Sequence, residues 1–409
     1  FHASTPDAMV SGASTLTNTA TRMVHVTVAA STEERMPQAL PKLWRPAQSG
    51  SLVRNARLCS WCAPLLRKCS GEAMLSTAEH NFGGVASAIG SVPHRDARAA
   101  AEFALASSPE LATIPSLPKR SPAESMIAQA VVGIRGVGLG QYGSIVVDPS
   151  VVDPLAPVVT DLHHDAFVGL RTFLDVADGR SGAIKWQFTG PVTLGLSLVR
   201  VGVPVHVAFD VAVRAVRTHL RNIHDHIATR LPDATQVVFI DEPMLGDLMD
   251  ESFPIAPDTA IDLMSGAMAV LERDCIVGLH TCSDVDVTPL LAAGPAILSV
   301  PVTDSLVDVG PVLSTFLDKG GVIAWGAVAT DGPMMATAER AWKKLSSLWC
   351  GLVQNGCDAM KLRQQSIVTP ACGLALHTEA NAEAIMEQVR DIAHRVRTQA
   401  LATRLTVGA

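Results

Sequence analysis

One histidine and two cysteines stand where a sequence could hold a soft metal ion. His280 and Cys282 come directly after one apolar run, and Cys372 comes shortly after another. Imidazole and thiolate are preferred zinc ligands, and three protein ligands leave the fourth tetrahedral position open for a substrate. A His-x-Cys pair is common, however, and a lone cysteine is usually a small buried apolar residue. The spacing alone therefore does not establish zinc chemistry, which requires a fold that brings these residues together.

Short apolar runs alternate with longer amphipathic stretches from about residue 80 onward. Most runs are continuous rather than alternating in polarity, which is typical of strands buried in a parallel sheet. About eight repeats of a strand followed by a helix predict a single α/β domain, a (β/α)8 TIM barrel. The predicted strands are 85–91, 144–147, 183–188, 236–241, 275–281, 296–300, 321–328 and 366–369. A doubly wound sheet is the alternative, but no complete GxGxxG motif joins a strand to a helix.

The carboxyl ends of the predicted strands carry the polar residues of interest. In a barrel of this type the active site forms at that end, from the loops that follow the strands. Asp241 and Glu242 close the fourth strand, His280 and Cys282 the fifth, and Cys372 follows the eighth. We therefore expect all five to face one mouth of the barrel.

Composition excludes several classes of protein. The 409 residues are 48% hydrophobic, with a net charge of −7 and no long run of Lys and Arg, so we expect neither a disordered chain nor a nucleic-acid partner. No segment has the roughly 18 uninterrupted apolar residues of a membrane span. The eight cysteines are dispersed through a long chain, which does not indicate a disulfide scaffold. A reducing cytoplasm and a small-molecule partner are the expectation.

The amino-terminal stretch differs from the rest of the chain. Residues 1–73 are basic and rich in Ser, Thr and Ala, and they show no sustained period of a helix or strand. The sequence predicts that they form a leader that is disordered or lies outside the mature domain. The barrel is expected over residues 80–405.

Five motifs together carry a resemblance to a known family. In chain order they are Ile89-Gly-Ser91, Thr189-Gly-Pro-Val-Thr193, Ile240-Asp-Glu-Pro243, His280-Thr-Cys282 and Pro370-Ala-Cys-Gly-Leu374. Their order resembles that of the catalytic domain of cobalamin-independent methionine synthases, which belong with the uroporphyrinogen decarboxylase-like barrels. The likeness covers roughly residues 85 to 400.

The resemblance implies a zinc-dependent methyltransferase. A methyl group would pass from a methyltetrahydrofolate to the thiol of homocysteine, giving methionine. His280, Cys282 and Cys372 would be the zinc ligands. Asp241 would be the catalytic-site carboxylate that meets the substrate ammonium group. Ile89, Ser91 and Glu242 are the remaining expected substrate contacts.

Ordinary structural roles remain open for the substrate-contact residues. Ser91 could instead cap a helix, and Asp241 and Glu242 could cap a helix start. Zinc would be useful to such an enzyme on chemical grounds alone. Coordination converts a substrate thiol of pKa about 8.5 into the nucleophilic thiolate.

The sequence also departs from the family pattern. No glutamate ends the strand after the His-x-Cys pair, where Asp304 is the nearest acid, and none lies around residues 135–143. The chain has no room for the second barrel that helps to bind folate in the large family members. The methyl donor is therefore open between methyltetrahydrofolate and a methyl-corrinoid. A decarboxylase or a corrinoid-linked methyltransferase acting on another substrate is the alternative function.

Overall fold

The computed structural model describes residue 77, residues 80–332 and residues 337–407, with side chains described up to residue 398. The predicted leader, residues 1–73, lies outside the described residues. The barrel predicted for residues 80–405 falls almost wholly within them.

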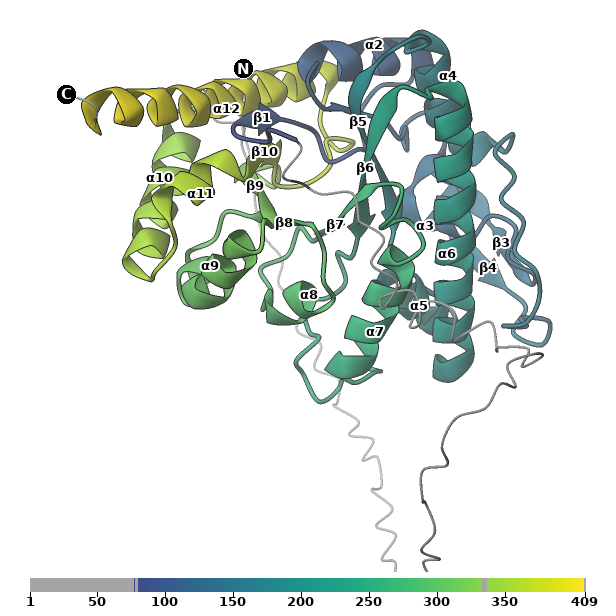
Figure 1. Cartoon of the computed structure of the whole chain (residues 1–409). Coiled ribbons are helices and arrows are strands. Elements are labelled where there is room, and N and C mark those ends of the chain that lie inside the picture. The colour runs from purple at the N-terminus through teal and green to yellow at the C-terminus, as the bar shows by residue number, and fades with distance from the viewer. Residues whose placement is uncertain (1–76, 78–79, 333–336, 408–409) are drawn as a thin grey trace, which may run out of the picture. The chain divides into compact units, whose positions relative to one another are not determined.

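Eight parallel strands form one curled sheet with helices around it, which confirms the predicted TIM-barrel architecture (Figure 1). Their order in the sheet is β1-β10-β9-β8-β7-β6-β5-β2. The strands are β1 (Val85–Ala86), β2 (Ala112–Thr113), β5 (Gly182–Thr189), β6 (Ala234–Asp241), β7 (Ile276–His280), β8 (Ile297–Pro301), β9 (Val322–Val328) and β10 (Ser366–Pro370).

The second barrel strand is not the one that the sequence predicts. Residues 144–147 contain β4 (Ile145–Val147), which pairs antiparallel with β3 (Val137–Leu139) in a separate hairpin. The barrel position belongs instead to β2, which pairs with β5. The prediction was wrong because β2 is only two residues long, too short to show a period, whereas the hairpin strand has a clear β-branched run.

Side-chain hydroxyl groups join the two ends of the sheet, where β1 and β2 share no strand ladder. The Thr113 hydroxyl donates to the Ala88 carbonyl over 3.1 Å and accepts from the Ala88 amide over 3.2 Å. Further along, Ser91 and Ser116 form a parallel bridge. These contacts fix the loop that follows β1 against the loop that follows β2.

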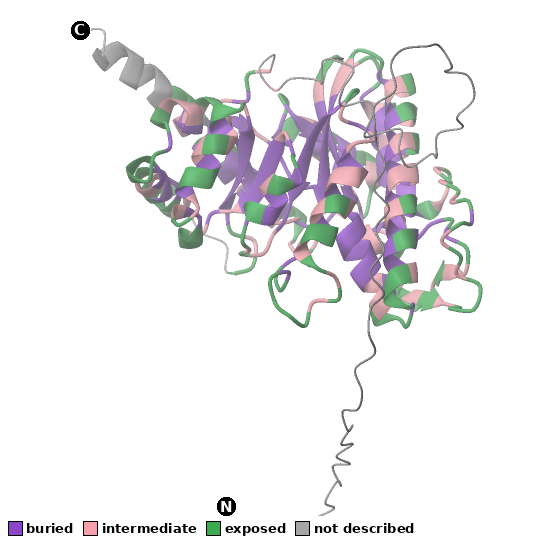
Figure 2. Cartoon of the chain, turned by 60° about the horizontal axis from the view of Figure 1, so that its bottom comes forward, coloured by how far each residue is buried: buried purple, intermediate pink, exposed green. Residues whose placement is uncertain are grey.

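The helices pack outside the sheet and leave the strands as the most buried layer (Figure 2). Proline begins several of them at the first turn, where its missing N–H costs nothing, as at Pro191 and Pro257. The last helix lies alongside β1, β9 and β10 (Figure 1). The helices are α2 (Ala97–Ser107), α3 (Met126–Ala130), α4 (Val168–Val176), α5 (Pro191–Arg200), α6 (Val205–Arg230), α7 (Pro257–Met268), α8 (Thr288–Ala292), α9 (Gly310–Asp318), α10 (Glu339–Gln354), α11 (Ala359–Gln364) and α12 (Glu379–Val407).

Two apolar clusters make up most of the core. The larger fills the space between the sheet and the helices. The smaller combines strand residues such as Val237, Phe239, Ile276 and Ile367. Because side chains alternate along a strand, these residues share the face opposite the helices and pack inside the barrel.

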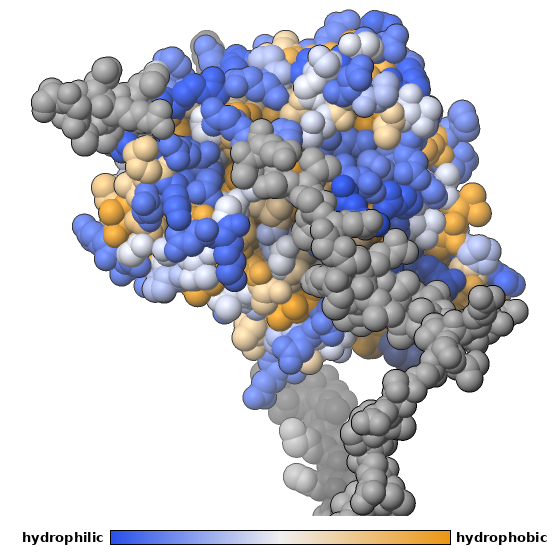
Figure 3. All heavy atoms as spheres, in the orientation of Figure 1, coloured by the Kyte–Doolittle hydropathy of each residue, from blue (hydrophilic) through white to orange (hydrophobic). Residues whose placement is uncertain are grey.

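Hydrophilic residues cover much of the face seen in Figure 3, with apolar residues scattered between them. No helix in the described part of the chain is long and apolar enough to cross a membrane.

Candidate active site

A cavity of about 260 Å³ lies where several strands reach their carboxyl ends. Six of the seven predicted site residues line it: Ile89, Ser91, Asp241, His280, Cys282 and Cys372. They come from the last residues of β6 and β7 and from the segments that follow β1, β7 and β10, which are far apart in the sequence. The parallel sheet therefore brings the predicted residues together, as expected for a barrel.

A hydrogen bond with the neighbouring strand β8 orients the His280 ring. The register aligns His280 with Asp241 on β6 and with Ser299 on β8. The Ser299 hydroxyl lies 2.9 Å from Nδ1 of His280, which leaves Nε2 as the ring atom available for a ligand. Burial lowers the pKa of His280 to about 3, so the ring is neutral near pH 7, the form that binds a metal.

The two cysteines of the cavity form a hydrogen-bonded pair. The Cys282 thiol donates to Cys372, and this bond lowers the pKa of Cys372 while it raises that of Cys282. The Gly373 amide also stabilises the Cys372 thiolate. Cys372 is therefore the more readily ionised of the two cysteines, and both residues are half-buried at the wall of the same cavity.

His280, Cys282 and Cys372 carry the donor atoms that zinc prefers, but their side chains do not converge on a common metal position. Among the described residues, no three His, Cys, Asp or Glu side chains lie close enough to hold a metal ion together. Ser299 lies on β8, the strand after the His-x-Cys pair, and its hydroxyl is hydrogen-bonded to the His280 ring. Asp304 is exposed in the short 3-10 helix Asp304–Val307 and does not line the cavity.

Asp241 presents a buried acceptor with no protein partner. Its side chain is 8% exposed and lines the cavity, and Oδ1 has no hydrogen-bond partner in the described part of the chain. Burial raises the pKa of Asp241, and the Lys185 ammonium opposes that rise. A cationic ligand in the cavity would satisfy this carboxylate, since a buried charge without a partner is costly.

Glu242 is the one predicted site residue that does not line the cavity. Its carboxylate is fully buried and accepts from the amides of Val192 over 2.9 Å and Thr193 over 2.6 Å, at the start of α5. A side chain at Gly190 would meet this carboxylate, because a Cβ there would lie 2.2 Å from Oε1. Glu242 therefore caps α5 instead of lining the cavity.

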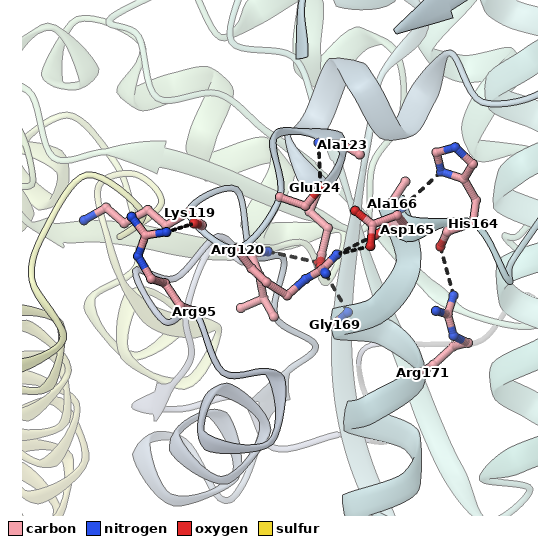
Figure 4. Close-up of polar contacts among 12 residues, drawn as sticks. Arg95, Lys119, Arg120, Ala123, Glu124, His164, Asp165, Ala166, Gly169 and Arg171 are labelled. Carbon is pink, nitrogen blue, oxygen red and sulfur yellow. Dashed lines mark hydrogen bonds and ion pairs between the residues drawn. The ribbon is translucent and has the colours of Figure 1, made fainter. Parts of the chain in front are cut away.

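The cavity wall contains a glutamate that the sequence analysis did not identify. Glu124 ends the 3-10 helix Pro122–Glu124 and is fully buried. Arg120 donates to it over 2.7 Å and also bonds Asp165 over 2.9 Å, as Figure 4 shows. The amides of Leu117 and Gly169 donate to its other oxygen over 3.1 Å and 3.3 Å.

Both carboxylate oxygens of Glu124 are thus already bonded to the protein. Burial raises its pKa, although these donors partly offset the effect. The Arg120–Glu124 spacing of four residues was the available sequence signal. It indicates a local ion pair rather than a position in a cavity.

These features define a class of site: a TIM barrel with an unpaired carboxylate, a neutral imidazole and a thiol–thiolate pair around one small cavity. No family model matches the chain, and a comparison with curated proteins finds no significant match. Among solved structures, the chain is similar to a B12-independent methionine synthase from Shewanella sp. W3-18-1 in complex with selenomethionine. The TM-score is 0.53 at 13% sequence identity, over 78% of this chain and 99% of that chain. This likeness confirms in fold the resemblance seen in the motifs.

Proposed function

We propose that this chain is a zinc-dependent methyltransferase that moves a methyl group from methyltetrahydrofolate, or from another donor such as a methyl-corrinoid, to the thiol of homocysteine to give methionine. One observation carries the proposal: a single cavity gathers Asp241, His280, Cys282 and Cys372 from the carboxyl ends of β6, β7 and β10. The similar solved structure was determined with selenomethionine, and a ligand of the methionine type suits this set of groups.

The polar wall of the cavity suits an amino acid. The unpartnered Asp241 carboxylate is placed to receive an ammonium group. The loop Ile89–Ser91 faces the same space and would hold the carboxylate end. This loop lies close to the chain after β10. A Cβ placed on Gly373 would lie only 2.1 Å from the Ser91 hydroxyl oxygen.

The sulfur end of the substrate would meet the thiol–imidazole group. His280, Cys282 and Cys372 would have to move closer together to hold zinc. Zinc, when bound, lowers the pKa of a coordinated thiol so that it is a thiolate at neutral pH. The chain contributes a neutral imidazole oriented by Ser299 and a Cys372 thiolate stabilised by its neighbours. With three protein ligands, one tetrahedral position is left for the substrate sulfur.

Metal analysis together with a methyl-transfer assay tests the proposal. We expect protein purified without added metal to contain about one zinc per chain and to produce methionine from homocysteine with one of the two donors. Cys282→Ser should lose both properties, because a neutral hydroxyl is a poor zinc ligand. Cys350→Ser is the matched control, since Cys350 is exposed on α10 and does not line the cavity.

Absence of zinc from the purified protein, with methyl transfer unaffected by chelators, would refute the zinc mechanism. Absence of methyl transfer with either donor, despite bound zinc, would refute homocysteine methylation as the activity.

A further inference from the structure

Lys185 places an ionisable amine inside the barrel. It lies in the middle of β5, is fully buried, and has its Nζ 4.4 Å from the centre of the Phe239 ring. No carboxylate of the described residues lies within ion-pair distance of it. A buried ammonium is expensive unless other groups accept its hydrogen bonds. The acceptors of Lys185 therefore indicate what this residue does.

Those acceptors lie at the base of the cavity. Lys185 Nζ donates to the Ile89 carbonyl oxygen over 2.6 Å and to Oε1 of Gln187 over 3.3 Å. Nε2 of Gln187 in turn donates to the Ile114 carbonyl oxygen over 3.1 Å. The two neighbouring side chains of β5 thus link the loop after β1 to the loop after β2.

The residue after Ile89 allows the loop to pack closely against β5. Gly90 has φ of 156°, and a Cβ on it would lie 2.2 Å from Cδ of Gln187. The backbone of the loop therefore packs directly on the Gln187 amide, an approach that only glycine permits. Ile89 and Gln187 both line the cavity, so movement of this contact would change the cavity wall.

Two further bonds attach the same loop to its neighbours. The Ser116 amide donates to the Gly90 carbonyl over 3.2 Å, and the Leu374 amide donates to the Ser91 carbonyl over 2.7 Å. These amides report on the position of the loop, because each bond opens if the loop moves away from β2 or from the chain after β10.

We infer that Lys185 is a positioning residue: through its bond to the Ile89 carbonyl it holds the loop Ile89–Ser91 in the conformation that receives the carboxylate of an amino-acid thiol. The inference rests on the proposed function for the identity of the ligand, but not for the effect of Lys185 on the loop. It gives a reason for the buried lysine at this position of β5.

A simpler role is that Lys185 only balances the charge of Asp241. Burial lowers the pKa of Lys185, and the nearby Asp241 carboxylate opposes that change. The two roles predict different specificity. Loss of charge balance at Asp241 would alter the binding of any ligand with an ammonium group, whereas loss of loop position would affect only ligands that also carry a carboxylate.

Hydrogen exchange and ligand specificity of Lys185→Met test the inference in the full chain. We expect the Ser116 and Leu374 amides to exchange at least tenfold faster, while the Glu242 amide, bonded to the His280 carbonyl, stays unchanged. KM for homocysteine should rise at least tenfold with kcat within threefold. Binding of 3-amino-1-propanethiol, which lacks the carboxylate, should stay within threefold. Lys361→Met is the matched control, because Lys361 pairs with Asp318 on the surface.

Two results would overturn the inference. One is unchanged exchange at both reporter amides; the other is an equal loss of affinity for homocysteine and for 3-amino-1-propanethiol. If the unmodified protein binds neither thiol, the proposed function fails, and the exchange measurement still decides whether Lys185 positions the loop.

A second variant covers the case in which Lys185→Met does not fold. In Gly90→Ala the new methyl group would displace the Gln187 amide, so the same two amides should lose protection. Unchanged protection in that variant would contradict the proposed bracing of the loop.

Discussion

Asp241 and Glu242 are adjacent carboxylates with opposite surroundings, and exchanging each for its amide should separate their roles. Asp241 has an unpartnered oxygen at the cavity, whereas Glu242 accepts from the Val192 and Thr193 amides at the start of α5. We expect Asp241→Asn to reduce substrate affinity without lowering stability. We expect Glu242→Gln to change stability and leave substrate affinity within about threefold.

The size of the Asp241 effect follows from the bond that it would make. A hydrogen bond to a charged group is worth about 1.5–3 kcal/mol, which corresponds to roughly a 10- to 150-fold loss of affinity for an ammonium ligand. Stability should not fall, because Oδ1 of Asp241 gives up no protein partner and the substitution removes a buried carboxyl group whose pKa is raised by burial.

Because of Glu242, the stability of the unmodified protein should fall as pH rises. Burial raises its pKa from 4.5 to about 7. The folded state therefore binds more protons than the unfolded state between these two values, and the stability of the unmodified protein falls as pH rises through this window. At 1.36 kcal/mol per pKa unit, this group contributes a change of about 3 kcal/mol. Glu242→Gln does not titrate, so its stability relative to the unmodified protein should rise by about that amount between pH 4.5 and pH 7.5.

Chemical denaturation at a series of pH values measures the stability difference, and calorimetry or steady-state kinetics with homocysteine measures affinity. The reasoning is refuted if Glu242→Gln weakens homocysteine as much as Asp241→Asn does. It is also refuted if the stability difference between Glu242→Gln and the unmodified protein is the same at pH 4.5 and pH 7.5.

Three further outcomes are expected. Cys282→Ser and Cys372→Ser should each lose most of the bound zinc and most of the methyl transfer. The thermal midpoint should stay nearly unchanged, since a catalytic metal contributes less to folding than a structural one. Metal analysis and thermal unfolding check this, and full retention of zinc would contradict it. Ser299→Ala should weaken zinc binding about 10- to 100-fold by freeing the His280 ring, measured by competition with a chelator, whereas unchanged affinity would remove the orienting role. Deleting residues 1–73 should leave thermal unfolding unchanged, and a fall of many degrees in the midpoint would show that they pack on the barrel.

Local pattern in the sequence was sufficient for the long barrel strands and for the residues at their ends. β5 to β10 contain runs of buried apolar residues, and such runs predict strands without knowledge of their neighbours. Parallel strands then place their carboxyl ends at one mouth of the barrel. This rule predicted that Asp241, Glu242, His280, Cys282 and Cys372 would face one mouth, and all of them except Glu242 line the cavity.

Tertiary structure decided the remaining features, because they depend on contacts between distant segments. β2 is a strand only because it pairs with β5, and Glu124 lines the cavity only because the segment after β2 folds against α4. Asp241 and Glu242 differ by one position in the sequence, yet one faces the cavity and the other caps α5, since successive side chains leave a strand in opposite directions. Lys185 looks like a polar interruption of a buried strand in the sequence. Its contact with Ile89, 96 residues away in the chain, gives that interruption its role, and only the curling of the sheet creates the contact.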